Sequence, residues 1–184
     1  EELNARLITL RANLVRIDGE LNLNTLQDLK NKLSIFPNEV AQAELDLFEA
    51  RKTELETIKE GFKKKKSKVE KDAFILESEG EGLKKLRYLL ELEMSEIFPL
   101  VKEGVIGKSE KFRLEREQTK ILTDLSVVKE KQIQNKFEVE KLETELKAVD
   151  KKNRKDLYQS RSQVIGEISQ LQARIPALSQ KLTE

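Results

Sequence analysis

The sequence contains no cysteine, no histidine and no tryptophan, and only three prolines and seven glycines among 184 residues. Without cysteine there are no disulfides and no thiol catalysis, and without histidine the chain lacks a usual zinc ligand and the commonest general base. No apolar run approaches the 18 or so residues that a membrane-spanning helix needs. We therefore expect no enzyme, no cofactor and no metal site. The chain begins at Glu1 without an initiator methionine, and we interpret it as a piece of a longer protein.

The composition is typical of long helices rather than of an ordinary globule. Charged residues make up 38% of the chain and aromatic residues only 5%, a bias that accompanies helices packed along a narrow seam. The 35 basic and 34 acidic residues are interspersed, which gives no reason to expect nucleic acid or an anionic membrane as a partner. The one basic run, Lys63–Lys66, is interpreted as a solvated helix face.

Two heptad patterns flank a short stretch that contains Gly104 and Gly107. Apolar residues before this stretch recur at every seventh position: Phe48, Leu55, Phe62, Val69, Leu76, Leu83, Leu90 and Ile97. A second series follows it: Leu114, Ile121, Leu125, Val128, Val139, Leu142, Leu146 and Val149. A heptad repeat on both sides of a glycine-bearing turn predicts two helices folded back on one another.

The predicted fold class is all-α: a long antiparallel coiled-coil hairpin with a short third helix packed at its base. The segments are a first helix over 1–19, which ends near Gly19, and a connector over 20–38, in which Asn24 or Thr25 caps a short helix. An ascending hairpin helix over 39–102, a tip over 103–108 and a descending helix over 109–184 complete the chain. The first helix is expected to run parallel to the ascending one.

Some seam positions are expected to be irregular. Three residues after the heptad positions, Ile58, Leu86 and Leu100 are apolar, but Lys65, Asp72 and Glu79 are not, so the seam is predicted to be thin between about 63 and 82. On the second helix, Gln118, Gln132 and Asn135 fall on the seam, where polar residues help to fix the register. Between 153 and 164 the spacing slips, which predicts a stutter.

The tip offers the clearest functional signal. Gly104–Ser109 resembles a phosphate-binding loop only superficially, because the required first glycine is replaced by Lys102 and no strand precedes it. Four aliphatic residues cluster at the end of the hairpin instead: Leu100, Val101, Val105 and Ile106. Apolar side chains at the end of a rod, beside glycines that let another backbone approach, favour a docking site. The candidate partner-binding residues are Leu100, Val101, Gly104, Val105, Ile106 and Gly107.

Several motifs in order resemble the HlyD-type periplasmic adaptors, the membrane fusion proteins of type I secretion systems. They are Phe36-Pro37, then Val40-Ala41-x-Ala43-Glu44-x-x-Leu47-Phe48-x-Ala50-Arg51, then Pro99-Leu-Val-Lys-Glu-Gly-Val-Ile-Gly-Lys-Ser-Glu110, then Leu114-Glu-Arg-Glu117. The resemblance covers nearly the whole chain, at the family's α-helical domain.

The resemblance implies a structural adaptor in the periplasm, anchored to the inner membrane in the full-length protein. Its tip would meet a TolC-like outer-membrane channel, its base would face an inner-membrane ABC transporter, and several copies would assemble as a homo-oligomer. Related drug-efflux adaptors carry an Arg-x3-Leu-x6-Ser tip motif, whose positions here are Glu96, Leu100 and Gly107, so only Leu100 matches. The alternative is a generic coiled-coil scaffold that forms a parallel dimer, in which residues 90 and 114 would each meet their own copy.

Overall fold

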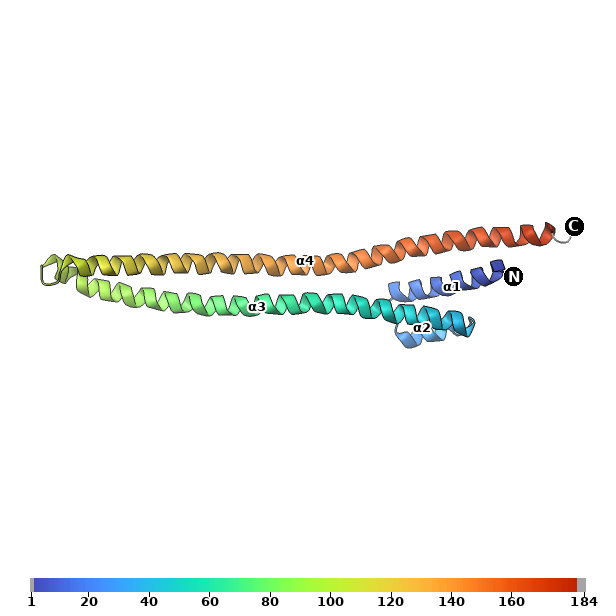
Figure 1. Ribbon diagram of the computed structural model, residues 1–184, viewed down its shortest axis with the longest axis horizontal. Helices are drawn as coiled ribbons and strands as arrows, with labels where there is room; N and C mark the ends of the chain where they lie inside the picture. Colours follow the sequence, from blue (N-terminus) through green and yellow to red (C-terminus); the bar gives the residue numbers. More distant parts are fainter. Residues whose placement is uncertain (1, 182–184) are drawn as a thin grey trace. The chain divides into compact units, whose positions relative to one another are not determined.

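The computed structural model describes residues 2–181, with side chains through residue 176. The described chain consists of four α-helices and contains no strand: α1 (Glu2–Leu21), α2 (Leu26–Leu33), α3 (Asn38–Lys102) and α4 (Lys108–Lys181) (Figure 1). Residues 182–184, where the predicted descending helix ends, lie outside the described residues. The chain divides into a turn unit, residues 62–144, and a terminal unit, residues 1–61 with 145–184.

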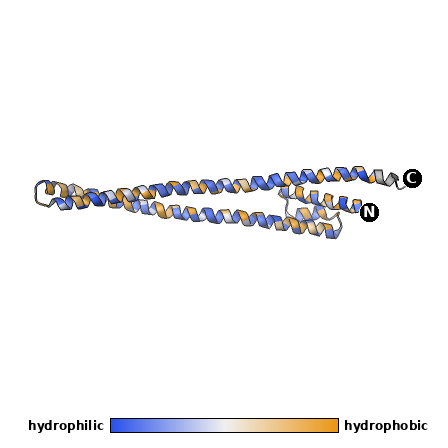
Figure 2. Cartoon of the chain, turned by 45° about the horizontal axis from the view of Figure 1, so that its top comes forward, coloured by the Kyte–Doolittle hydropathy of each residue, from blue (hydrophilic) through white to orange (hydrophobic). Residues whose placement is uncertain are grey.

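In the turn unit, α3 and α4 pair in opposite directions within one chain. Leu90 of α3 packs with Leu114 and Ile121 of α4 in a buried cluster, and further along Lys66 Nζ lies 2.6 Å from a carboxylate oxygen of Glu143. The polypeptide therefore reverses between the two helices, which confirms the predicted hairpin. A parallel dimer would instead have paired Leu90 with its own copy. Figure 2 shows apolar and polar residues alternating along both helices, as expected for a narrow buried seam.

The seam of the turn unit differs in one respect from the prediction. The residues of α3 that face α4 between the heptad positions lie four residues after them rather than three, and they include Lys66, Ala73 and Gly80. Leu86, which was expected to contribute to the seam, is 54% exposed, and Ile58 in the terminal unit is exposed as well. Steps of three and of four both keep residues on one side of a helix, so the heptad positions alone do not decide which step faces inward, and the packing against α4 selects the step of four.

Two polar side chains of α4 cross the seam of the turn unit. Gln132 Nε2 donates to the backbone carbonyl of Leu76 at 3.2 Å, and Asn135 Nδ2 donates to that of Val69 at 3.4 Å. A helix carbonyl has a second lone pair, so it accepts these bonds without giving up its own helix bond. A shift of register would leave both amides half-buried and without a partner, which is costly. These two hydrogen bonds therefore explain how Gln132 and Asn135 help to fix the register.

The terminal unit is built around a buried cluster of Ala12 on α1, Leu29 and Leu33 on α2, and Phe48 on α3. Thr25 is the N-cap of α2, as the sequence predicts, and its hydroxyl accepts a hydrogen bond from the backbone N–H of Asp28. The hydrogen bond from the Thr25 hydroxyl to the Asp28 carboxylate lowers the pKa of that carboxyl below its usual value. This capping box fixes the start of the short helix, and Leu29 and Leu33 pack it against Phe48 of α3.

Gly19 does not end α1, which continues to Leu21. It lies buried at a close approach to α2, where a Cβ atom added to it would stand 3.1 Å from Leu29 Cδ1. A glycine at this position is therefore explained by the tight packing of two helices rather than by the end of a helix. The chain leaves α1 through Leu23, which has a positive φ of 55°.

A buried ion network joins α1 to α3. Arg16 Nε donates to Glu44 Oε2 at 2.7 Å and Arg16 also pairs with Glu20, while Arg51 Nε donates to the other oxygen of Glu20 at 3.0 Å. The side chains of Arg16 and Glu44 are only 7% and 9% exposed. Residues 16 and 20 meet residues 44 and 51 in the same order, so α1 runs parallel to α3, as predicted.

Between residues 153 and 164 the inward-facing positions of α4 follow one another at steps of four, at Asn153, Leu157 and Arg161, before the step of three to Val164. This extra step is the predicted stutter. The sequence analysis named no core residue in this stretch, but Leu157 is 3% exposed and belongs to the core. Arg161 extends to Asp18 of α1 at 2.7 Å, so the irregular spacing coincides with the stretch of α4 that contacts α1.

Candidate functional site at the hairpin turn

The end of α3 is closed by a pair of backbone hydrogen bonds around Gly104. The N–H of Val105 donates to the carbonyl of Leu100 at 2.9 Å, and the N–H of Gly104 donates to that of Val101 at 3.1 Å. Gly104 has a φ of +78°. This bond pair with a left-handed glycine is a Schellman motif, which satisfies the last carbonyls of a helix. The sequence stops α3 here because only glycine adopts this conformation without steric cost.

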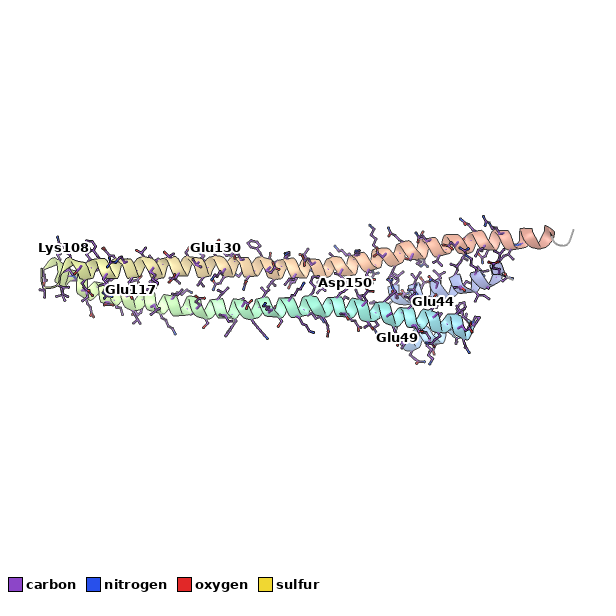
Figure 3. All side chains as sticks on the ribbon, viewed as in Figure 1. Glu44, Glu49, Lys108, Glu117, Glu130 and Asp150 are labelled. Carbon is purple, nitrogen blue, oxygen red and sulfur yellow. The ribbon has the colours of Figure 1, made fainter. Side chains whose placement is uncertain are left out.

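Helix α4 starts immediately afterwards. The N–H of Glu110 donates to the carbonyl of Gly107 at 3.1 Å, so Gly107 is the residue that leads into the helix, and Lys108 is its first residue (Figure 3). The side chain of Arg113 donates to the Glu110 carboxylate at 2.8 Å, and this bond lowers the pKa of that carboxyl. The turn is therefore fixed on both sides by helix ends.

The aliphatic residues of the turn divide into two groups. Val105 is 70% exposed and Leu100 is 37% exposed, whereas Val101 and Ile106 are half-buried. The first pair is available to a partner, while the second pair is less accessible. The structure thus brings all six predicted residues into one short turn but gives them different surroundings. Glu96, at the first position of the efflux-adaptor motif, is exposed on α3.

Arg113 is a residue that the sequence analysis missed. Besides Glu110, it pairs with Glu117 at 3.0 Å on its own helix and with Glu93 of α3 at 3.2 Å. The spacing from 110 to 113 and from 113 to 117 is that of side chains on one helix face, which could have revealed the first two contacts. The bond to Glu93 depends on the hairpin. It joins the two helices just below the turn, beside the apolar cluster of Leu90 and Leu114.

We expect a Gly104→Ala variant to lose about 1–2 kcal/mol of stability, because an L-residue with a side chain is strained at positive φ. Urea unfolding followed by circular dichroism measures this loss. Gly82→Ala is the matched control, since a Cβ at Gly82 meets nothing within 4 Å inside α3. That variant should gain up to about 1 kcal/mol, because alanine is the better helix former. Equal effects of the two variants would contradict the role of Gly104.

The described residues offer little support for other kinds of site. They contain no group of three or more acidic side chains placed to hold a metal ion. None of the described helices contains a stretch that is both long and apolar enough to cross a membrane. The glycine turn that resembles a phosphate-binding loop follows the helix α3 rather than a strand.

The fold and the turn define a class of protein: a long antiparallel helical hairpin whose chain reverses at a glycine-capped turn. The chain belongs to the family described as AprE, long alpha-helical hairpin, whose sequence profile matches residues 1–181. The resemblance noted in the sequence is thereby confirmed at the level of the family.

A solved structure has the same fold. The crystal structure of the soluble domain of LipC, a membrane fusion protein of a type I secretion system, superimposes with a TM-score of 0.86 over the whole chain and 88% of the LipC chain. The two sequences are 14% identical, so this likeness establishes the fold alone. No curated protein matches the chain in sequence.

Proposed function

We propose that this chain is the helical hairpin of a type I secretion adaptor. In this function it stands in the periplasm, contacts a TolC-like outer-membrane channel through its turn, and works with an inner-membrane ABC transporter as one of several copies. The observation that carries the proposal is the match of the whole chain to the fold of LipC, which is itself a membrane fusion protein of such a system. Membership of a long-hairpin family supports it.

The turn supplies the contact in this proposal. Val105 and Leu100 offer exposed aliphatic surface beside Gly104 and Gly107, where the backbone is open to a partner. Val101 and Ile106, beside them in the sequence, are half-buried. Such a contact needs no charged group at Glu96 and no hydroxyl at position 107, the two positions at which the chain departs from the efflux-adaptor motif. The adaptor role is structural and involves no chemistry of its own.

Substituting Val105→Asp and Leu100→Asp in the intact protein that carries this chain should reduce export of its substrate by about tenfold or more, because burying an unpaired charge in an apolar contact costs several kcal/mol. Secreted substrate in the culture medium is the readout. Val127→Asp is the control, since Val127 is also exposed, on α4 of the turn unit, but lies outside the turn. Normal export by the double variant would remove the turn from the mechanism.

A further inference from the structure

Two strips of opposite charge lie in the terminal unit, one on α3 and one on α4. Between residues 38 and 61, α3 carries seven acidic and three basic residues, whereas α4 between 145 and 175 carries seven basic and four acidic ones. This asymmetry is hidden in the whole chain, whose formal net charge is +1. We define the acidic strip as Glu39, Asp46, Glu49, Glu56 and Glu60, and the basic strip as Lys147, Lys151, Arg154 and Lys155.

Each strip follows one side of its helix and points to solvent. The members of the acidic strip are separated by seven, three, seven and four residues, and in the basic strip Lys151 is four residues after Lys147 and is followed by Arg154 and Lys155 at three and four residues, which are helical same-side spacings. All nine side chains are exposed; Glu49 is labelled in Figure 3. The opposite side of α3 is occupied by its buried contacts, such as Glu44 and Phe48, and on α4 the buried Leu157 lies beside the basic strip.

Within the described chain most of these charges have no counterion. Glu49, Glu56 and Glu60 form no ion pair with another described side chain, and neither do Lys151 and Lys155. Arg154 only donates to the Tyr158 hydroxyl at 3.4 Å. Many surface charges are simply solvated, but like charges gathered along one side repel each other and favour a partner of opposite sign.

The basic strip lies level with one end of the acidic strip, at Glu56 and Glu60. Lys59 Nζ lies 2.6 Å from Asp150 Oδ1, and the neighbours of this pair in sequence are Glu60 in the acidic strip and Lys151 in the basic strip. A second copy placed beside the first, pointing the same way and not shifted along the axis, would therefore bring Glu56 and Glu60 of its acidic strip level with the basic strip of the first. Contacts between two different surfaces of identical chains repeat around a ring.

We propose that one copy of this chain binds the next through the acidic strip of α3 and the basic strip of α4. The inference rests on the proposed function, in which several copies act together, and it specifies the surfaces that meet. The occupant of each strip is thus the opposite strip of a second copy. Charge complementarity of this kind sets orientation and register, and it suppresses contacts between like strips.

The native sequence contains no cysteine, so single cysteines can be introduced cleanly. A Glu56→Cys chain is mixed with a separately purified Arg154→Cys chain and treated with a short bismaleimide. The expected product is the mixed dimer, in several-fold excess over the dimer of either variant with itself. Equal yields of mixed and self dimers, or no covalent dimer, would overturn the proposal. In 1 M salt, where charges are screened within about 3 Å, the excess should disappear.

Charge reversal provides the second test. Lys151→Glu with Lys155→Glu, added to the Arg154→Cys chain, should lower the yield of the mixed dimer by roughly tenfold. Glu49→Lys with Glu60→Lys, added to the Glu56→Cys chain, should restore it against the reversed partner. All four positions are exposed, so folding is not at risk, and circular dichroism checks this. Export is not the readout, so failure here contradicts the strip contact, whereas normal export by the turn variants contradicts the proposed function.

Discussion

An Arg16→Ala variant is expected to be less stable than the unsubstituted chain by about 3–5 kcal/mol, because it leaves two buried carboxylates without their common partner. Arg16 is the only side chain that contacts both Glu20 and Glu44 among the described residues. Removing it leaves Glu44, on α3, without the ion pair that the structure shows. Glu20 would keep only Arg51, which is more exposed.

Urea unfolding measures the loss of stability in the Arg16→Ala variant, and amide hydrogen exchange of the intact chain shows which helix loses protection. Protection should decrease in α1, since α1 is held to α3 through this network. Arg6→Ala is the matched control, because Arg6 also joins α1 to another helix, through Glu167, but with side chains 64% and 47% exposed. Exposed pairs contribute roughly 0–1 kcal/mol. If the two variants were equally stable, the network would be structurally unimportant.

A Leu114→Ala variant is expected to lose about 2–5 kcal/mol, the cost of removing a large buried aliphatic side chain and leaving a cavity. Leu114 is completely buried and packs with Leu90 and Ile121. Among the described leucines of the turn unit it is the least exposed. A narrow seam has few such layers, so each layer contributes a large share of the pairing between α3 and α4.

Leu122→Ala makes the same chemical change eight residues further along α4, where the side chain is 47% exposed. It should cost much less, since less apolar surface leaves the core. Hydrogen exchange in residues 83–125 separates the two variants, because only the loss at Leu114 should expose the amides on both helices near the turn. A loss of protection as large for Leu122→Ala would show that the cluster does not hold this end of the hairpin.

The periodic parts of the sequence were sufficient to predict the hairpin. Residues such as Leu83, Leu90 and Ile97 recur at every seventh position. Each of them adds to the same pattern, and the pattern is recognised from nearby residues without knowledge of distant contacts. The turn was predictable for a similar reason, because Gly104 interrupts a helical pattern at one place. The six turn residues were therefore identified together, although their different exposure depends on how α4 packs under them.

Contacts between distant segments were not predictable in this way. Arg16 and Glu44 look like ordinary surface charges in the sequence, and only the packing of α1 against α3 makes them buried partners. The prediction that Gly19 ends the first helix was wrong, because Gly19 lies inside α1 and its closest contact, Leu29, belongs to another helix. Leu157 escaped notice because a stutter displaces it from the expected periodicity.

The sequence by itself determined that this protein is a helical hairpin and where it turns, because heptad spacing and a left-handed glycine act through neighbours in the chain. The tertiary structure alone decided which side of each helix is buried. A step of four instead of three rotates the inner side of α3 toward Lys66 and Gly80 and leaves Leu86 exposed. In the terminal unit, the burial of Glu44 and Phe48 leaves the acidic strip on the solvent side of α3, because residues about half a turn from a buried position face outward.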